Sequence, residues 1–287
     1  MKRIGIVAML ALAVLASGRP RLHAEESPAA TTRSVNIAAV DAKGGIVTDL
    51  TAADLTVKDG GKDATVSSLA ADTTPMQIAI IVDDAGTGGF QPVVAQVLQG
   101  TIARAEFSIR QMSPQALVIQ DYTQDVALLK AALGRLGQRG KLLPEAEQLV
   151  DGISESAKEH VRRKSARPVI LVLTVGGDND QSSNIDQVLT EVVASGAIVD
   201  LLSLPTTPIG RVLGDGPKFS GGRIEAVGGT SSTALQAATA RIVDHLMHQY
   251  TLTYTLADGV KPNERISIAT KRKGVTLLAP TRLAVKQ

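Results

Sequence analysis

Three runs made up mostly of apolar residues constrain the fold of this chain more than any other feature. They lie at residues 76–82, 169–175 and 197–204 and are rich in β-branched side chains. The stretches between these runs space their apolar residues at the period of a helix. Apolar strands separated by helices are typical of a parallel sheet that is covered on both faces. We therefore predict a doubly wound, mostly parallel α/β domain over residues 76–248.

The helical stretches can be read from their spacing. Val94, Leu98, Ile102, Ala105 and Ile109 recur at the period of one helix face. We expect this helix over 94–109 and further helices over 144–161, 185–194 and 233–249. A strand is expected over 116–122.

Both ends of the chain show a different pattern, the alternation of a half-buried strand. Residues 33–75 alternate apolar and polar side chains between glycine turns, and so do residues 250–256. Residues 265–283 indicate a hairpin that turns at Lys273 and Gly274. Three isolated strands cannot bury a core, so we expect residues 249–287 to pack with 33–75 as one small antiparallel β-sandwich.

The first 24 residues have the pattern of a secretory signal peptide. Lys2 and Arg3 precede about a dozen apolar residues, fewer than the ~20 that span a bilayer. Residues 25–32 form a polar leader. The chain is therefore expected to be exported, either secreted or periplasmic, without membrane contact once the signal is removed.

The charge balance and the residue types exclude several functions. Removing residues 1–24 takes away four basic residues and no acids, so the net charge falls from +2 to −2. Three Tyr, three Phe and no Trp leave few rings to stack on bases, so nucleic acid is not an expected partner. The absence of cysteine excludes thiolate metal sites and cysteine catalysis.

Acids and glycines follow the first apolar run, where a phosphate loop could stand. Asp83 and Asp84 lead into Gly86, Gly88 and Gly89, but no lysine follows to reach a phosphate. Gln91 stands where a dinucleotide-binding loop needs its third small residue, and the two carboxylates would repel a pyrophosphate. Neither nucleotide loop is expected.

A cation loop fits the same residues better. Asp83, Ala85 and Thr87 follow the rhythm of D-x-S-x-S at a strand end. This segment resembles the first loop of the metal-ion-dependent adhesion site in von Willebrand factor type A domains, where oxygen ligands hold a cation such as Mg²⁺. Residues 116–129, 167–183 and 195–204 resemble later parts of that domain. With the flanking segments, the chain resembles the VWFA-related family of secreted bacterial proteins over residues 33–283.

The departures from the family pattern indicate a degenerate cation site. Val175 stands where the resemblance implies an aspartate, Ala85 replaces one hydroxyl, and residues 141–143 replace the expected threonine. One carboxylate and one hydroxyl would bind Mg²⁺ weakly at best, so no cofactor is expected. The alternative is a rebuilt site, with Asp84, Asp178 and Asp180 as substitute ligands.

Catalytic motifs are sparse. The chain has neither G-x-S-x-G nor S-x-x-K. One helix face could bring together Asp244, His245 and His248 around a metal. The simpler interpretation is that the histidines border the apolar stripe by which this helix is buried, formed by Leu235, Ala238, Ile242 and Leu246. A periplasmic hydrolase that uses the Asp83 cleft with His160 or His245 is a third alternative. We predict no enzyme.

The functional prediction is an exported, non-enzymatic protein-interaction or scaffolding protein. Its partner, an unknown protein, is expected at the carboxyl ends of the strands. The predicted contact residues are Asp83, Asp84, Thr87 and Asp178. A metal-dependent adhesion module with a rebuilt site remains the main alternative.

Overall fold

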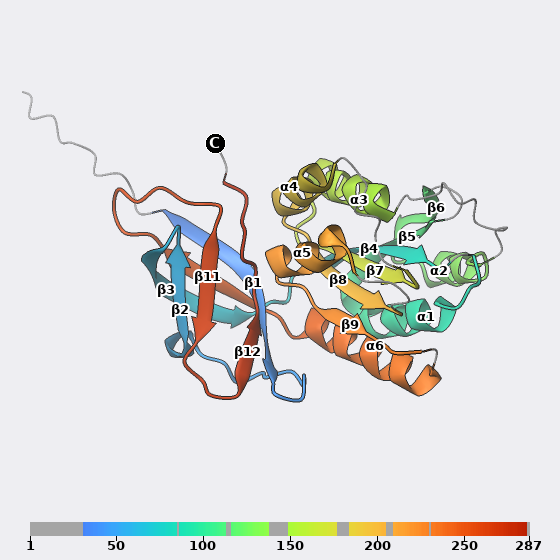
Figure 1. Cartoon of the computed structure of the whole chain (residues 1–287), viewed down its shortest axis with the longest axis horizontal. Helices are drawn as coiled ribbons and strands as arrows, with labels where there is room; N and C mark the ends of the chain where they lie inside the picture. The colour runs from blue at the N-terminus through green and yellow to red at the C-terminus, as the bar shows by residue number, and fades with distance from the viewer. Residues whose placement is uncertain are drawn as a thin grey trace, which may run out of the picture.

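The chain folds into two units, each built on a six-stranded sheet (Figure 1). The computed structural model describes residues 31–84, 86–112, 116–137, 149–176, 184–204, 209–229 and 231–285. The predicted signal peptide and all but two residues of the leader lie outside these ranges, and so do Asp178 and Asp180. No helix within the described ranges is both long and apolar enough to cross a bilayer.

The α/β unit contains a sheet of order β6-β5-β4-β7-β8-β9. Its strands are β4 (Met76–Asp83), β5 (Ala105–Met112), β6 (Ala116–Thr123), β7 (Pro168–Thr174), β8 (Ile198–Ser203) and β9 (Ile224–Ala226). Every neighbouring pair is parallel except β5 and β6. The predicted mostly parallel α/β fold is therefore confirmed.

Helices cover both faces of this sheet. One face carries α1 (Gln91–Thr101), α2 (Val126–Leu133) and α6 (Ser232–Met247), and the other carries α3 (Leu149–Arg163), α4 (Ile185–Ser195) and α5 (Arg211–Ser220). Figure 1 shows the two layers on opposite sides of the strands. Alternate residues of β4 feed the two cores, with Ile80 and Val82 in the first and Ala79 and Ile81 in the second.

The expected helix over 94–109 is wrong in its second half. Helix α1 ends at Thr101, a short 3-10 turn follows, and Ala105 begins strand β5. Ala105, Phe107 and Ile109 are fully buried, at a period of two rather than a helical period. Polar residues fill the alternate positions, and this alternation is the strand signal that the helical spacing concealed.

The second unit is antiparallel and combines both ends of the chain. Its sheet has the order β11-β2-β3-β10-β1-β12. The strands are β1 (Thr32–Asp41), β2 (Leu55–Asp59), β3 (Lys62–Ala71), β10 (Tyr250–Thr255), β11 (Ile266–Thr270) and β12 (Val275–Leu278). Strand β10 lies between β1 and β3, so the C-terminal segment completes the N-terminal one. The predicted sandwich of the two terminal segments is confirmed.

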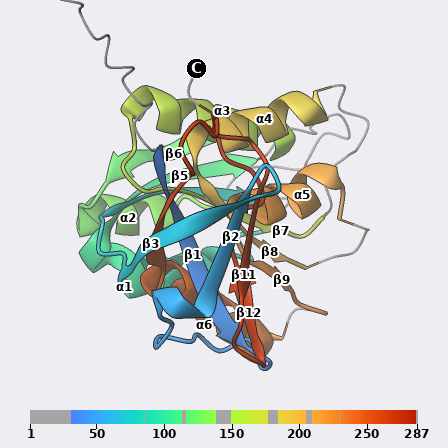
Figure 2. The same ribbon diagram turned by 90° about the vertical axis from the view of Figure 1, so that its left-hand side faces the viewer.

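The predicted hairpin over 265–283 is confirmed at its base, where Arg265 and Arg282 form an antiparallel bridge, but not along its two strands. Strand β11 pairs with β2 and strand β12 pairs with β1, at opposite ends of the sheet order. The sheet curves around its own core, so its edges come together: Ile266 N donates to Thr281 O at 3.1 Å. Figure 2 shows β2 and β3 crossing in front of β1. The partners β1 and β2 are distant in sequence, so local turn chemistry could not reveal them, whereas the pairing at the base follows the predicted turn.

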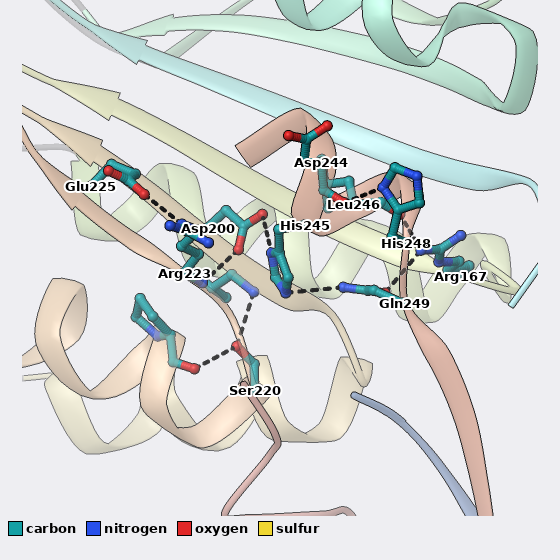
Figure 3. Close-up of polar contacts among 12 residues, drawn as sticks. Arg167, Asp200, Ser220, Arg223, Glu225, Asp244, His245, Leu246, His248 and Gln249 are labelled. Carbon is teal, nitrogen blue, oxygen red and sulfur yellow. Dashed lines mark hydrogen bonds and ion pairs between the residues drawn. The ribbon is translucent and has the colours of Figure 1, made fainter. Parts of the chain in front are cut away.

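A buried arginine joins the two units. Arg167, 2% exposed, lies just before β7. Its Nε is 3.2 Å from Asp72 Oδ2, and its Nη2 donates to Gln249 Oε1 at 2.9 Å (Figure 3). Asp72 and Gln249 belong to the two connections between the sheets. Burial lowers the pKa of Arg167, and Asp72 opposes this shift.

Replacing Arg167 should destabilise the protein strongly. Arg167→Ala leaves Asp72 buried without its counter-charge, which typically costs about 3–5 kcal/mol. Urea unfolding measures this loss. Arg211→Ala is the control, because the Arg211–Asp186 pair is exposed and should contribute less than about 1 kcal/mol. Equal losses in the two variants would contradict a fixed junction at Arg167.

Candidate functional site

The candidate site lies at the carboxyl end of β4. The chain leaves β4 for β5 on one side and later returns to β7 on the other. In open α/β sheets this change of direction opens a crevice beyond the strand ends, where ligands commonly bind. Asp83 is the last residue of β4 and Thr174 the last of β7.

Asp83 is held by its neighbouring strand. Its Oδ2 accepts a hydrogen bond from Thr174 Oγ1 at 2.8 Å, and its carbonyl accepts from Val175 N at 3.0 Å. Burial raises the pKa of Asp83; Thr174 opposes this shift and Asp84 adds to it. The site therefore disfavours the ionised form of this carboxyl.

Polar side chains continue from Asp83 across the next two strands. Asp83 is in register with Thr174, and Thr174 with Ser203 at the end of β8. Thr174 Oγ1 also accepts from Gly176 N at 3.0 Å. Ser203 Oγ is buried without a hydrogen-bond partner among the described residues. The two hydroxyls were missed from the sequence, although the strand-end alignment of a parallel sheet could have found them.

Asp84 is 1% exposed and fixes the loop that follows β4. Its Oδ1 accepts from Gly86 N at 3.1 Å. Its Oδ2 is buried with no hydrogen-bond partner in the part of the chain that the structure describes. Asp84 thus forms the loop from within, while one of its oxygens remains unsatisfied.

The hydroxyl of Thr87 serves its own turn. It donates to Asp84 O at 2.9 Å and accepts from Gly89 N at 3.2 Å. Gly88 has a φ of 74° and lies against Gly137, where an added Cβ would meet the Gly88 Cα at 2.5 Å. The loop is therefore packed against the chain after α2, and Thr87 itself is exposed.

The predicted contact residues divide into two groups. Asp83, Asp84 and Thr87 lie together at the end of β4, and their role in partner binding stays a prediction. Asp178 lies outside the described residues, as do Ala85, Asp180 and residues 141–143. Val175, at the position of the implied aspartate, packs against the apolar core beside α1, α2 and α6.

The described residues do not fit a Mg²⁺ site. They contain no cluster of three or more acidic or histidine side chains placed to hold a metal. Asp83 Oδ2 accepts a hydrogen bond from Thr174 Oγ1, so one oxygen of this carboxyl is already engaged. The Thr87 oxygen is committed to its turn. The only oxygens beside Asp83 that the described chain offers in register are neutral hydroxyls.

The histidines of α6 do not share a metal site. His245 is fully buried, and its Nδ1 is 3.1 Å from Asp200 Oδ2. Its other ring nitrogen faces Gln249 Nε2 at 3.3 Å (Figure 3). His248 is exposed and contacts the Asp244 carbonyl at 3.0 Å. Instead of bordering the buried stripe, His245 joins the polar network at the junction.

His160 is also buried, far along the chain from the Asp83 loop. Its Nδ1 is 3.0 Å from Ser165 Oγ, and its Nε2 is 3.1 Å from the Val169 carbonyl at the start of β7. Burial lowers the pKa of His160 to about 4. Because β7 begins at the opposite end of the sheet from Asp83, the two side chains do not meet.

Comparison with known proteins identifies similar structures. No protein-family model matches the chain, and no curated protein matches it in sequence. A von Willebrand factor type A protein from Catenulispora acidiphila is 11% identical, with 88% of this chain and 73% of that one covered and a TM-score of 0.47. The SpRpn10 VWA domain is 11% identical over 58% of this chain and 94% of its own, with a TM-score of 0.45. An aerotolerance-related membrane protein from Bacteroides fragilis is 14% identical over 60% and 98%, with a TM-score of 0.43.

Two of these three structures, the Catenulispora protein and the SpRpn10 domain, are named for the domain expected from the sequence. The likeness is one of chain path, at identities too low to indicate ligands or partners. The chemistry of the site has to be judged from its own residues.

Removing the charge of Asp83 should stabilise the protein at neutral pH. A carboxyl with a raised folded pKa loses stabilisation as the pH rises from its unfolded pKa through its folded pKa. Asp83→Asn keeps an oxygen to accept from Thr174 and avoids this loss. Its melting temperature should exceed that of the wild type at pH 7 and converge with it below pH ~4.

Thermal unfolding from pH 3.5 to 8 measures this difference. The contribution of His160 to the pH dependence of stability is present in both proteins, so it cancels in the comparison. Thr174→Val is the companion variant. It removes the donor that favours ionised Asp83, so it should be less stable than the wild type at pH 7. A lower melting temperature of Asp83→Asn at pH 7 would show that the charge itself is stabilising.

Proposed function

We propose that this chain is an exported, non-enzymatic protein-interaction or scaffolding protein. Its α/β unit contacts a protein partner at the carboxyl ends of β4 and β7 without a bridging cation, through Asp83, Thr87 and Asp178. The buried Asp84 supports this surface by holding the loop from within. Export is proposed from the signal-peptide pattern of residues 1–24.

One observation carries the cation-independent contact. The Asp83 carboxyl is partly buried and accepts a hydrogen bond from Thr174, while Val175, at the position of the implied aspartate, packs against the core. A working cation site would need ionised oxygens converging on one point. Here the carboxyl is stabilised by a neutral donor, so it resembles a structural group more than a ligand.

The non-enzymatic proposal rests on how the polar groups are used. The His245–Asp200 pair has Gln249, not a nucleophile, against its other nitrogen. His160 has Ser165 Oγ 3.0 Å from its Nδ1, but its Nε2 faces the Val169 carbonyl and burial lowers the pKa of this imidazole to about 4. Each candidate catalytic group is thus occupied by a structural contact, and a hydroxyl poised for transfer would need a free base nearby.

A second candidate is an adhesion module with a rebuilt cation site. The observation in its favour is Asp84 Oδ2, a buried carboxylate oxygen with no partner among the described residues. Asp178 and Asp180 are the acids that could join it. The two candidates differ in one measurable property, the binding of a divalent cation.

Titration with Mg²⁺ and Mn²⁺ separates them. The purified mature chain should give only heats of dilution in calorimetry, with no saturation below about 1 mM, the weak limit of extracellular cation modules. Asp83→Ala should behave identically. A saturable heat that Asp83→Ala abolishes would establish the rebuilt site instead.

Partner capture should not depend on divalent cations. The immobilised mature chain, exposed to native envelope extract, should retain the same protein with and without EDTA. Thr87→Arg places a large side chain on the exposed loop and should reduce capture at least fivefold. Thr190→Arg, on the exposed face of α4, is the matched control and should retain it. Loss of capture in EDTA would contradict the proposal.

A further inference from the structure

Half of strand β1 has an open edge. Its residues 32–37 pair with β10 on one side. On the other side β12 pairs only with residues 38–41. About six residues, or roughly 20 Å of strand at 3.4 Å per residue, therefore lack a neighbouring strand on this second side.

The main-chain groups of this open edge can be assigned by alternation. Leu256 N donates to Thr31 O at 2.9 Å, so residues 31, 33 and 35 face β10. Thr32, Ser34 and Asn36 then direct their N–H and C=O groups to the open side. Within the described ranges, no group hydrogen-bonds to the main chain of these three residues on that side. An unpaired edge of this kind can template another strand.

The chain after β12 leaves β1 and creates space beside it. Pro280 forms an isolated bridge with Ser220, and Thr281 N donates to Phe219 O at 3.1 Å. These contacts hold residues 280–282 against the end of α5, so they do not continue the β12 ladder along β1. Further on, Ala284 O accepts from the Arg33 side chain at 3.0 Å. Figure 1 shows this C-terminal segment in dark red on the side of the sandwich that faces the α/β unit.

The resulting space is a cavity of about 620 Å³ between the two units. Residues 31–36 of β1 form one wall, and the C-terminal residues Pro280 and 282–285 form another. The third wall comes from the α/β unit: residues 166–168, the end of α4 and the end of α5. The open edge thus faces a groove between the two units, which suits one extended segment better than a second sheet.

The charges that line the groove have one sign. Arg33, Arg167 and Arg282 line it, and no described aspartate or glutamate does. Arg33 forms a salt bridge with the buried Asp59, and Arg167 forms one with the buried Asp72. Arg282 is more accessible, 35% exposed, and lies 4.0 Å over the Phe219 ring with one bond to the exposed Glu264. A guanidinium has five N–H donors, so Arg282 can donate hydrogen bonds to a further carboxylate.

We propose that this groove binds an extended segment of another protein by strand addition to β1. The main chain of the segment pairs with Thr32, Ser34 and Asn36, and an acidic side chain reaches Arg282. Main-chain bonds supply affinity, and Arg282 supplies the preference for a carboxylate. The groove is separate from the Asp83 loop, so an experiment can reject this proposal without affecting the proposed function, and the reverse.

A synthetic probe tests the pairing. The probe is a labelled heptapeptide that alternates threonine and valine around one central glutamate, titrated against the full mature chain by fluorescence anisotropy. Saturable binding is expected. The affinity should fall at least threefold when glutamine replaces the glutamate, and it should fall further when lysine replaces it. N-methylation of alternate amides should abolish binding in one register and spare it in the other. No binding, or no register dependence, overturns strand addition.

Variants of the chain locate the site. Ser34→Pro removes one N–H of the open edge but leaves the β10 pairing, and it should weaken the glutamate peptide at least fivefold; Ser34→Ala should not. Arg282→Gln tests the groove without altering β1 and should equalise the glutamate and glutamine peptides. A folded Ser34→Pro that binds like the wild type overturns the proposal. The proposal is also overturned if sedimentation analysis shows a dimer that Ser34→Pro disrupts, because the occupant of the groove would then be a second copy of this chain.

Discussion

The position of β10 between β1 and β3 is the constraint on which the rest of the structure depends. Neither end of the chain supplies enough strands to enclose a core, so the antiparallel unit forms only when residues 250–255 reach the N-terminal strands. The α/β unit is consequently held at both of its ends. Arg167 joins these two connections through Asp72 and Gln249, which fixes the groove between the units. Covalent order and a buried charge together determine where the two sheets meet.

This arrangement gives the molecule two separate polar surfaces at opposite ends of the parallel sheet. The carboxyl ends of β4, β7 and β8 present Asp83, Thr174 and Ser203 in register. The amino end faces the antiparallel unit and its open β1 edge. The first surface has the location of a ligand site, but its hydrogen bonds are largely internal. The second has unpaired main-chain groups and an accessible guanidinium, and so more capacity for a partner.

The sequence predicted the elements whose signals are local. The apolar runs at 76–82 and 169–175 became strands, and the alternation of Tyr250, Leu252 and Tyr254 became the central strand of the sandwich. It failed where two periods overlap, as at Ala105 and Ile109, and where pairing is long-range, as for β11 and β12. Arg167 and Gln249 were missed because their partners lie about 80 residues or more away in sequence. The role of Thr174 depends on the register of β4 with β7, which local periodicity does not define.

The central proposal is that no divalent cation binds beside Asp83, because Val175 and Ala85 stand where the resemblance implies metal ligands. Diffraction from crystals soaked in Mn²⁺, with data at a wavelength where manganese scatters anomalously, tests it directly. The account predicts no anomalous peak within bonding distance of Asp83 and an unchanged bond to Thr174 Oγ1. A peak there, surrounded by about six oxygen atoms, would contradict the account.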